Sequence, residues 1–271
     1  MNRKRIKRII QWVVIIYCLL GTALYYLQEK MIFHPTPIAF TDTFKIDRPF
    51  KEVNIPYDPH TNLSIIKFEV PREKKKGAVL YFHGNMKNVE YYAPLTEEFQ
   101  NRGYDVWMLD YPGYGKSTGK ISEKLMYEFS EQMYKMANSE INADSIVLYG
   151  KSLGTGLASY IAAKKTAAYL ILETPYYSMH SVAFSRFPIY PVAMMMHFEF
   201  PTYSYLYECK TPVFIFHGTD DRTISLSSAQ KLKKYLKPGD EFLVVEGGKH
   251  NGLQKNLLVQ KKLDSILGKV F

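Results

Sequence analysis

The chain has 271 residues, of which 46% are hydrophobic and 23% are charged, and this size and composition suit one globular domain with a short appendage. The formal net charge of +9 could favour binding to an anionic partner. Beyond the N-terminus, however, the basic residues are spread along the chain as on a solvated surface, so we expect no nucleic-acid partner. The two cysteines, Cys18 and Cys209, lie far apart and outside any Cys/His cluster, which predicts neither a disulfide nor a zinc site.

The N-terminal segment has the pattern of a membrane anchor. Residues 9–27 carry no charge, and a helix of about 19 residues rises about 28 Å, close to the hydrocarbon thickness of a bilayer. Trp12, Tyr25 and Tyr26 lie near its two ends, where aromatic belts form. The segment follows five basic residues: Arg3, Lys4, Arg5, Lys7 and Arg8. The basic cluster is expected to stay cytoplasmic, which places the rest of the chain on the far side, in the periplasm if the source is bacterial.

A cleaved signal peptide is the alternative interpretation. Cleavage needs small residues before the cut, and the residues around Ala23 match this poorly. A lipoprotein site at Cys18 is also poor, because Tyr17 precedes it. We therefore predict a single-pass signal anchor in residues 1–30, followed by a folded domain in residues 31–271.

The folded domain shows an alternation of strands and helices. Residues 51–55 and 63–70 resemble strands, and short apolar runs then recur at 78–82, 106–109, 146–149, 169–172, 213–216 and 241–245. Between these runs, helical patterns cover residues 89–102, 122–136, 153–164, 227–235 and 253–267. Continuous apolar strands alternating with helices predict an α/β fold with a mostly parallel, doubly wound sheet.

One long interval interrupts this alternation. Residues 173–212 contain many aromatic, Met and Pro residues, including a run from Met194 to Met196. We interpret residues 176–210 as a small cap inserted over the sheet edge.

A Gly-x-Ser-x-Gly motif lies between a predicted strand and a predicted helix. Ser152 is flanked by Gly150 and Gly154. A nucleophilic serine at this position needs a sharp, strained turn, and glycines leave room where a Cβ would meet crossing backbone. The helix that follows directs its N-terminal N–H groups at the reacting centre. We predict that Ser152 is a nucleophile.

A serine hydroxyl requires a base, and the base requires a carboxylate partner. His250 lies in a loop between the last strand and the last helix, where a doubly wound hydrolase carries its base. Asp220 and Asp221 both follow the strand at 213–216, and Glu173 follows the preceding strand as a weaker third candidate. Spacing alone leaves the choice between the two aspartates open.

An oxyanion hole needs two backbone N–H groups. The residue after the nucleophile, Leu153, supplies one in this arrangement. The loop after the strand at 78–82 should supply the other, and Asn85 is our first candidate there, with Met86 second.

Several motifs together resemble the Bem46-like and ABHD13/ABHD17-like group of α/β-hydrolases. They are MIFHP at 31–35, YFHGN at 81–85, DYPGYGKSTG at 110–119, YGKSLGTG at 149–156, FHGTDD at 216–221 and EGGKHN at 246–251. The resemblance covers most of the chain after residue 31, although the Met194 to Met196 run departs from the shared pattern. Members of the group look like membrane-anchored serine hydrolases without a cofactor, and some act as protein depalmitoylases. The group's HGxxD pattern implies that Asp221 is the acid.

We therefore expect a membrane-anchored serine hydrolase that cleaves an ester or thioester through Ser152, His250 and Asp221. The cap composition favours an apolar or lipid-like acyl substrate, although its Met and aromatic residues could equally form cap core or pack on lipid. A serine peptidase on the same fold and a non-catalytic membrane-tethered binding protein are the alternatives. No cofactor or metal is expected.

Overall fold

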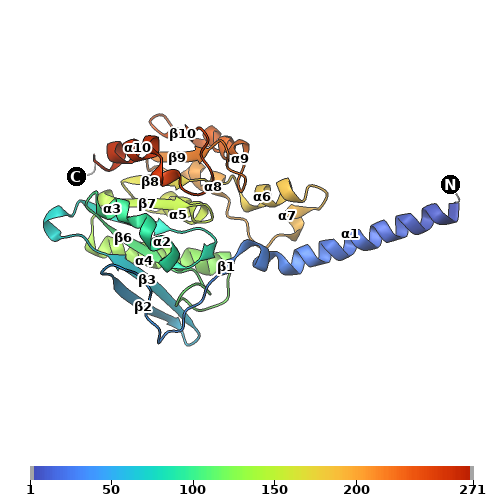
Figure 1. Ribbon diagram of the computed structural model, residues 1–271, viewed down its shortest axis with the longest axis horizontal. Coiled ribbons are helices and arrows are strands. Elements are labelled where there is room, and N and C mark those ends of the chain that lie inside the picture. Colours follow the sequence, from blue (N-terminus) through green and yellow to red (C-terminus); the bar gives the residue numbers. More distant parts are fainter. Residues whose placement is uncertain (1–2, 269–271) are drawn as a thin grey trace.

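An eight-stranded sheet organises the chain, and one long helix projects away from it (Figure 1). The computed structural model describes residues 3–268. The strand order is β10-β9-β8-β7-β4-β6-β3-β2, in which β3 is antiparallel to both of its neighbours, β2 and β6, and every other adjacent pair is parallel. The strands are β2 (Lys51–Asp58), β3 (Thr61–Phe68), β4 (Gly77–Phe82), β6 (Tyr104–Leu109), β7 (Ile146–Lys151), β8 (Tyr169–Glu173), β9 (Val213–Gly218) and β10 (Glu241–Val245). The predicted doubly wound, mostly parallel sheet is thus confirmed.

Side chains on both faces of the central strands are buried, which explains their continuous apolar runs. In β7, Ile146 and Leu148 join a core with helices α4 (Glu123–Glu140), α5 (Gly154–Lys164) and α8 (Thr202–Glu208). The alternate residues Val147 and Tyr149 face the opposite core, which includes residues of α10 (Leu257–Leu267). A strand covered on both faces has no solvent-facing side and therefore no polar alternation.

The N-terminal helix is longer than the predicted apolar segment. Helix α1 (Arg3–Ile32) includes the basic cluster and passes the predicted boundary at residue 30. It is long and apolar enough to cross a membrane by length and composition. A two-stranded pair that the sequence did not suggest, β1 (His34–Pro35) with β5 (Met86–Lys87), then joins the chain to the domain. The predicted domain limits 1 and 271 lie outside the described residues.

Three predicted helices were too long. The segment 89–102 is broken into α2 (Val89–Tyr92), a 3-10 turn (Ala93–Thr96) and α3 (Glu97–Gln100), because Pro94 has no N–H to continue the helix. Residues 227–235 form α9 (Leu226–Gln230) and a 3-10 turn (Lys231–Tyr235). The last helix begins at Leu257 because the Asn256 side chain caps it, and a 3-10 turn (Leu253–Lys255) precedes it.

The segment between β8 and β9 contains three short helices. They are α6 (Met179–Arg186), α7 (Val192–Met195) and α8. In α6, the side chains of Ser178 and Ser181 form a capping box at the helix start. Figure 1 shows α6 and α7 on the side of the domain that faces α1. Helix α8 instead packs into the core beside α5.

Candidate active site

The turn between β7 and α5 holds Ser152 in a strained backbone conformation. Its φ is 50°, in the left-handed region that residues with a Cβ rarely adopt. A Cβ on Gly154 would lie 2.0 Å from the carbonyl oxygen of Phe82, and a Cβ on Gly150 would lie 2.6 Å from that of Gly154. Both glycines are therefore required by close backbone approach, which lets the turn project the serine above the sheet edge.

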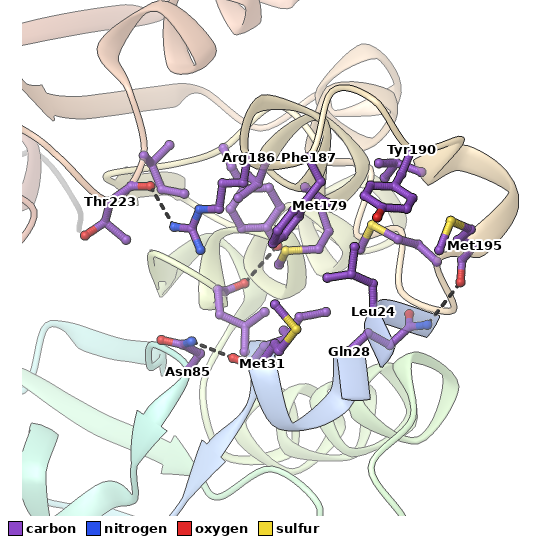
Figure 2. Close-up of a pocket in the computed structure, with 18 of the residues that line it drawn as sticks. Leu24, Gln28, Met31, Asn85, Met179, Arg186, Phe187, Tyr190, Met195 and Thr223 are labelled. Atoms are coloured by element: carbon purple, nitrogen blue, oxygen red, sulfur yellow. Dashed lines mark hydrogen bonds between the residues drawn. The ribbon is translucent and has the colours of Figure 1, made fainter. Parts of the chain in front are cut away.

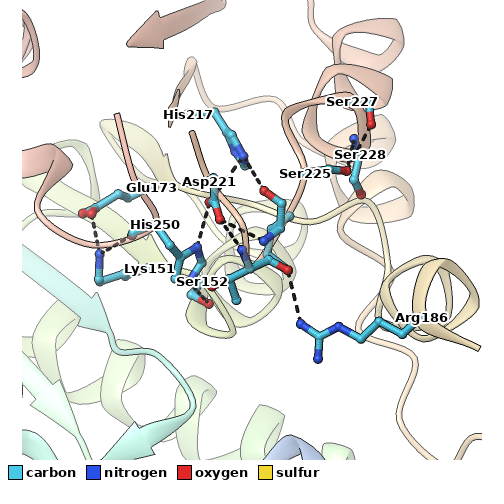
Figure 3. A network of polar contacts seen from close by, with 12 residues as sticks. Lys151, Ser152, Glu173, Arg186, His217, Asp221, Ser225, Ser227, Ser228 and His250 are labelled. Carbon is cyan, nitrogen blue, oxygen red and sulfur yellow. Dashed lines mark hydrogen bonds and ion pairs between the residues drawn. The ribbon is translucent and has the colours of Figure 1, made fainter. Parts of the chain in front are cut away.

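His250 and Asp221 form a hydrogen-bonded chain with Ser152 (Figure 3). Nε2 of His250 lies 3.0 Å from Oγ of Ser152, and its Nδ1 lies 2.7 Å from Oδ2 of Asp221. The three residues lie in the turns that follow β7, β9 and β10. These strands and β8 are adjacent in the sheet, in the order β10-β9-β8-β7. The structure thus brings together the three side chains that the sequence singled out.

Asp221 is held by more than the histidine. Its Oδ1 accepts hydrogen bonds from the amides of Thr223 at 2.8 Å and Ile224 at 2.9 Å. Burial acts to raise the pKa of Asp221, but the hydrogen bonds from His250, Ile224 and Thr223 outweigh it and hold the pKa below its ordinary value. His217 lies 3.5 Å from Oδ2, and burial lowers the pKa of this imidazole. Asp221 is therefore a fixed, ionised acceptor for Nδ1–H of His250.

The two other carboxylates considered from the sequence point elsewhere. Asp220 is exposed and interacts with the hydroxyl of Thr219, while its amide donates to Gly248. Glu173 is buried and accepts from Lys151 and from the hydroxyl of Tyr149. Neither side chain has a hydrogen bond to His250 in the described part of the chain.

The candidate oxyanion-hole residues border the same space. Leu153 directly precedes α5, and Ser152, Leu153 and Asn85 all line one pocket. Gly84 brings its loop close to the nucleophile, since a Cβ there would lie 3.8 Å from Cβ of Ser152. Met86, the second candidate, belongs to β5 and pairs in register with His34.

The pocket above Ser152 is mostly apolar and has three walls (Figure 2). One wall is the turn around Ser152, one is the cap, and the third is the C-terminal end of α1. The α1 residues are Leu24, Gln28, Met31 and Ile32, and the cap residues are Met179, Val182, Ala183, Arg186, Phe187, Tyr190, Val192, Met195 and Met196. The remaining lining residues are Tyr176, Thr223 and Ile224.

Sequence reasoning missed the α1 wall. The sequence assigns residues up to 30 to the anchor alone, and Gln28, near the end of the apolar helix, has no distinguishing sequence pattern. Gln28 is buried, and it donates to the carbonyl of Met195 and accepts from the amide of His197.

The cap methionines divide between two environments, because Met195 and Met196 line the pocket whereas Met194 is exposed. In residues 3–268, no cluster of three or more His, Cys, Asp or Glu side chains is placed to hold a metal ion.

Comparison with known proteins agrees with this architecture. The model of the serine aminopeptidase S33 family matches residues 73–204, just under half of the chain. The chain is 29% identical over 195 residues to alpha/beta hydrolase domain-containing protein aho-3 of Caenorhabditis elegans, covering 70% of this chain and 57% of that protein. It is 30% identical over 183 residues to human alpha/beta hydrolase domain-containing protein 17B, covering 66% of this chain and 62% of the relative. The matched segment thus spans less than two thirds of these relatives.

Solved structures share the fold at low sequence identity. An esterase from Pyrococcus furiosus superposes with a TM-score of 0.69 at 16% identity, over 88% of this chain and 97% of the esterase. A soluble variant of monoglyceride lipase from Saccharomyces cerevisiae gives a TM-score of 0.65 at 15% identity, over 85% and 98% of the two chains. The sheet order and these likenesses show the α/β-hydrolase fold, and the curated matches relate the chain to the ABHD17-like group of alpha/beta hydrolase domain-containing proteins.

Proposed function

We propose that the protein is a membrane-anchored serine hydrolase that cleaves carboxylic esters or thioesters with an apolar acyl group. The observation that carries this proposal is the chain of contacts from Ser152 through His250 to Asp221, with Ser152 lining an apolar pocket. A hydroxyl, an imidazole and a buried carboxylate in this order form the arrangement that activates a serine nucleophile.

In this mechanism Oγ of Ser152 attacks the acyl carbon and its proton passes to Nε2 of His250. Asp221 orients the imidazole through Nδ1 and stabilises its charged form. The N–H groups of Leu153 and Asn85 stabilise the oxyanion. His250 then protonates the departing alcohol or thiol. A water molecule, deprotonated by His250, attacks the acyl-enzyme, and the acid leaves as Ser152 regains its proton.

The pocket lining favours an apolar acyl group over a peptide. An aminopeptidase substrate carries a free α-ammonium group, which a carboxylate in the pocket would have to bind. The lining contains no Asp or Glu, and its one charged side chain, Arg186, would repel a cation. Two structural neighbours, an esterase and a monoglyceride lipase, agree with ester cleavage. The match to the serine aminopeptidase S33 family keeps peptide cleavage as the second candidate.

A non-catalytic binding protein is a weaker third candidate. Such a protein has no need for strain at Ser152, where φ is 50°, nor for a serine that hydrogen-bonds to the imidazole of His250. Positions of this kind persist where they serve chemistry, because strain costs stability.

We assign residues 1–30 to a single-pass anchor and residues 31–271 to the catalytic domain, with the basic N-terminus on the cytoplasmic side. The length and apolarity of α1 support a membrane span. Five basic residues before the apolar segment support the orientation.

The substrate class is tested with p-nitrophenyl esters of increasing acyl length, using the full chain in lipid nanodiscs. We expect turnover that Ser152→Ala abolishes, with a preference for longer chains. Ala183→Phe, which fills the pocket, should reduce cleavage of long esters much more than cleavage of the acetate. The matched variant Ala193→Phe, at an exposed cap position outside the pocket, should change neither. Equal turnover by Ser152→Ala would refute the proposal, and faster cleavage of aminoacyl p-nitroanilides than of esters would favour the peptidase.

A further inference from the structure

Helix α1 contacts the cap near the middle of the helix, at Tyr17, well before α1 ends at Ile32. The rings of Tyr17 and Tyr190 stack with centroids 4.6 Å apart and planes inclined by 6°. The hydroxyl of Tyr17 donates to the carbonyl of Ile189 at 3.0 Å, and the hydroxyl of Tyr190 donates to the carbonyl of Tyr17 at 3.1 Å. Two reciprocal hydrogen bonds and a stacked pair fix the cap at this level of the helix.

A second set of contacts lies further along α1. The side chain of Gln28 donates to the carbonyl of Met195 at 3.0 Å and accepts from the amide of His197 at 2.8 Å. Tyr25 packs edge-on against the ring of His197. From Tyr17 to Gln28 the helix rises about 16 Å, so the cap follows α1 over a length comparable with one bilayer leaflet.

These contacts set the depth of the cap if α1 spans the membrane. Tyr17 lies about 15 Å along the helix from Leu27, where the apolar segment ends, and therefore near the middle of a hydrocarbon layer about 30 Å thick. Ile189 and Tyr190, bound at that level, would share its surroundings.

The cap has the composition that this depth requires. Residues 187–196, here called the cap tip, contain no charged residue. Ile189 is 70% exposed and Met194 is 86% exposed, although both are apolar, and the preceding helix adds Phe184 at 57%. The polar hydroxyls at the contact, those of Tyr17 and Tyr190, each have a hydrogen-bond partner, as groups surrounded by hydrocarbon must.

We propose that the cap tip is embedded in the bilayer leaflet beside α1, so that the active-site pocket receives acyl substrates laterally from that leaflet. The proposal builds on the membrane-anchored hydrolase proposed above. The pocket wall formed by Leu24, Gln28 and Met31 of α1 supports this route, because the same helix that spans the bilayer then lines the path to Ser152 (Figure 2). The occupant of the exposed cap face is lipid hydrocarbon, and the substrate is an ester that resides in the bilayer.

The depth of the cap tip is measured with a fluorophore on a single cysteine at Ile189→Cys, in the full chain carrying Cys18→Ser and Cys209→Ala, in vesicles. The matched control is Leu257→Cys, at a leucine that is 69% exposed at the start of α10. Figure 1 shows α10 on the side of the domain away from α1. We expect lipids brominated along the acyl chain to quench the label at 189 and aqueous iodide to quench the label at 257. Iodide quenching at 189 would overturn the proposal. So would a label at 189 shielded from both quenchers, which would indicate protein contact such as a second copy.

Lateral entry is tested with Ile189→Glu, because Ile189 is outside the pocket lining and outside the proposed triad. A charge placed in hydrocarbon opposes insertion, so cleavage of a long-chain ester held in the vesicles should fall at least about tenfold. Cleavage of p-nitrophenyl acetate by the same variant, and both activities of Leu257→Glu, should remain unchanged. Full activity of Ile189→Glu on the vesicle substrate would contradict lateral entry. If the unmodified chain cleaved no ester at all, the hydrolase proposal would be refuted instead. The quenching result does not depend on that proposal.

Discussion

Oδ2 of Asp221 lies 2.7 Å from Nδ1 of His250, whereas the adjacent Asp220 has its carboxylate near Thr219. Two consecutive aspartates thus have different surroundings, one fixed by backbone amides and one exposed. This difference provides a matched pair for testing the acid.

Asp221→Asn removes the negative charge that orients and stabilises the imidazole while keeping the side-chain size. We expect kcat for ester cleavage to fall by about 10³- to 10⁴-fold. Asp220→Asn should retain kcat within about twofold, because surface changes away from a site have small effects. Steady-state kinetics of both variants measures this, and a large loss in Asp220→Asn alone would assign the acid to Asp220.

Backbone strain at Ser152 predicts an order of stability for two inactive variants. Glycine tolerates a φ of 50° without the Cβ penalty, so Ser152→Gly should be more stable than Ser152→Ala by about 1 kcal/mol. At Lys135, an exposed position within α4, the order should reverse, because alanine favours a helix over glycine by a similar amount. Denaturant unfolding gives both differences, and alanine being the more stable at both positions would exclude strain at Ser152.

The buried ion pair of Lys151 and Glu173 supports the loop that carries His250. Nζ of Lys151 also lies 3.4 Å from the carbonyl oxygen of His250. Lys151→Met leaves Glu173 charged and unpaired in the core, which should cost about 3–5 kcal/mol of unfolding free energy. Adding Glu173→Gln removes the charge and keeps an acceptor for Tyr149, so the double variant should recover most of that loss. A double variant no more stable than Lys151→Met would contradict this account.

Asp110 predicts a loss of stability as pH rises from 3.8 to about 8. Burial raises the pKa of this carboxyl from 3.8 to about 8, against the hydrogen bond from the amide of Val89. The folded state therefore binds the proton more tightly than the unfolded state, so the stabilising contribution is complete at low pH and is lost as pH rises towards about 8. Unfolding free energies measured from about pH 5 to about pH 9 should decline less in Asp110→Asn than in the unmodified chain. Parallel declines would show that Asp110 is not responsible.

Much of the sheet could be predicted because its strands have a simple cause. Central strands buried on both faces are short apolar runs, and the run at 146–149 falls within β7 (Ile146–Lys151), all of whose residues are buried. The segment 89–102 is predicted as one helix, yet Pro94 divides it. The pair of β1 and β5 has two residues in each strand, which is too short for any periodic signal.

Site residues that belong to a sequence motif could be predicted from the sequence. Site residues that reach the pocket only through tertiary contacts could not. Ser152 and His250 occupy turns whose positions follow from the order of strands. The choice of Asp221 over Asp220 needed the resemblance to a family, because both follow β9. The α1 wall of the pocket depends on contacts across more than 160 residues, such as Gln28 with Met195, which no local pattern contains.

The central claim is that Ser152 is an activated nucleophile. We would label the full chain in its membrane with a fluorophosphonate probe, beside Ser152→Ala and beside Ser227→Ala as a control serine. The account predicts covalent labelling of the unmodified chain and of Ser227→Ala, and none of Ser152→Ala. Labelling of Ser152→Ala, or no labelling of any of the three in a preparation shown to be folded, would contradict it.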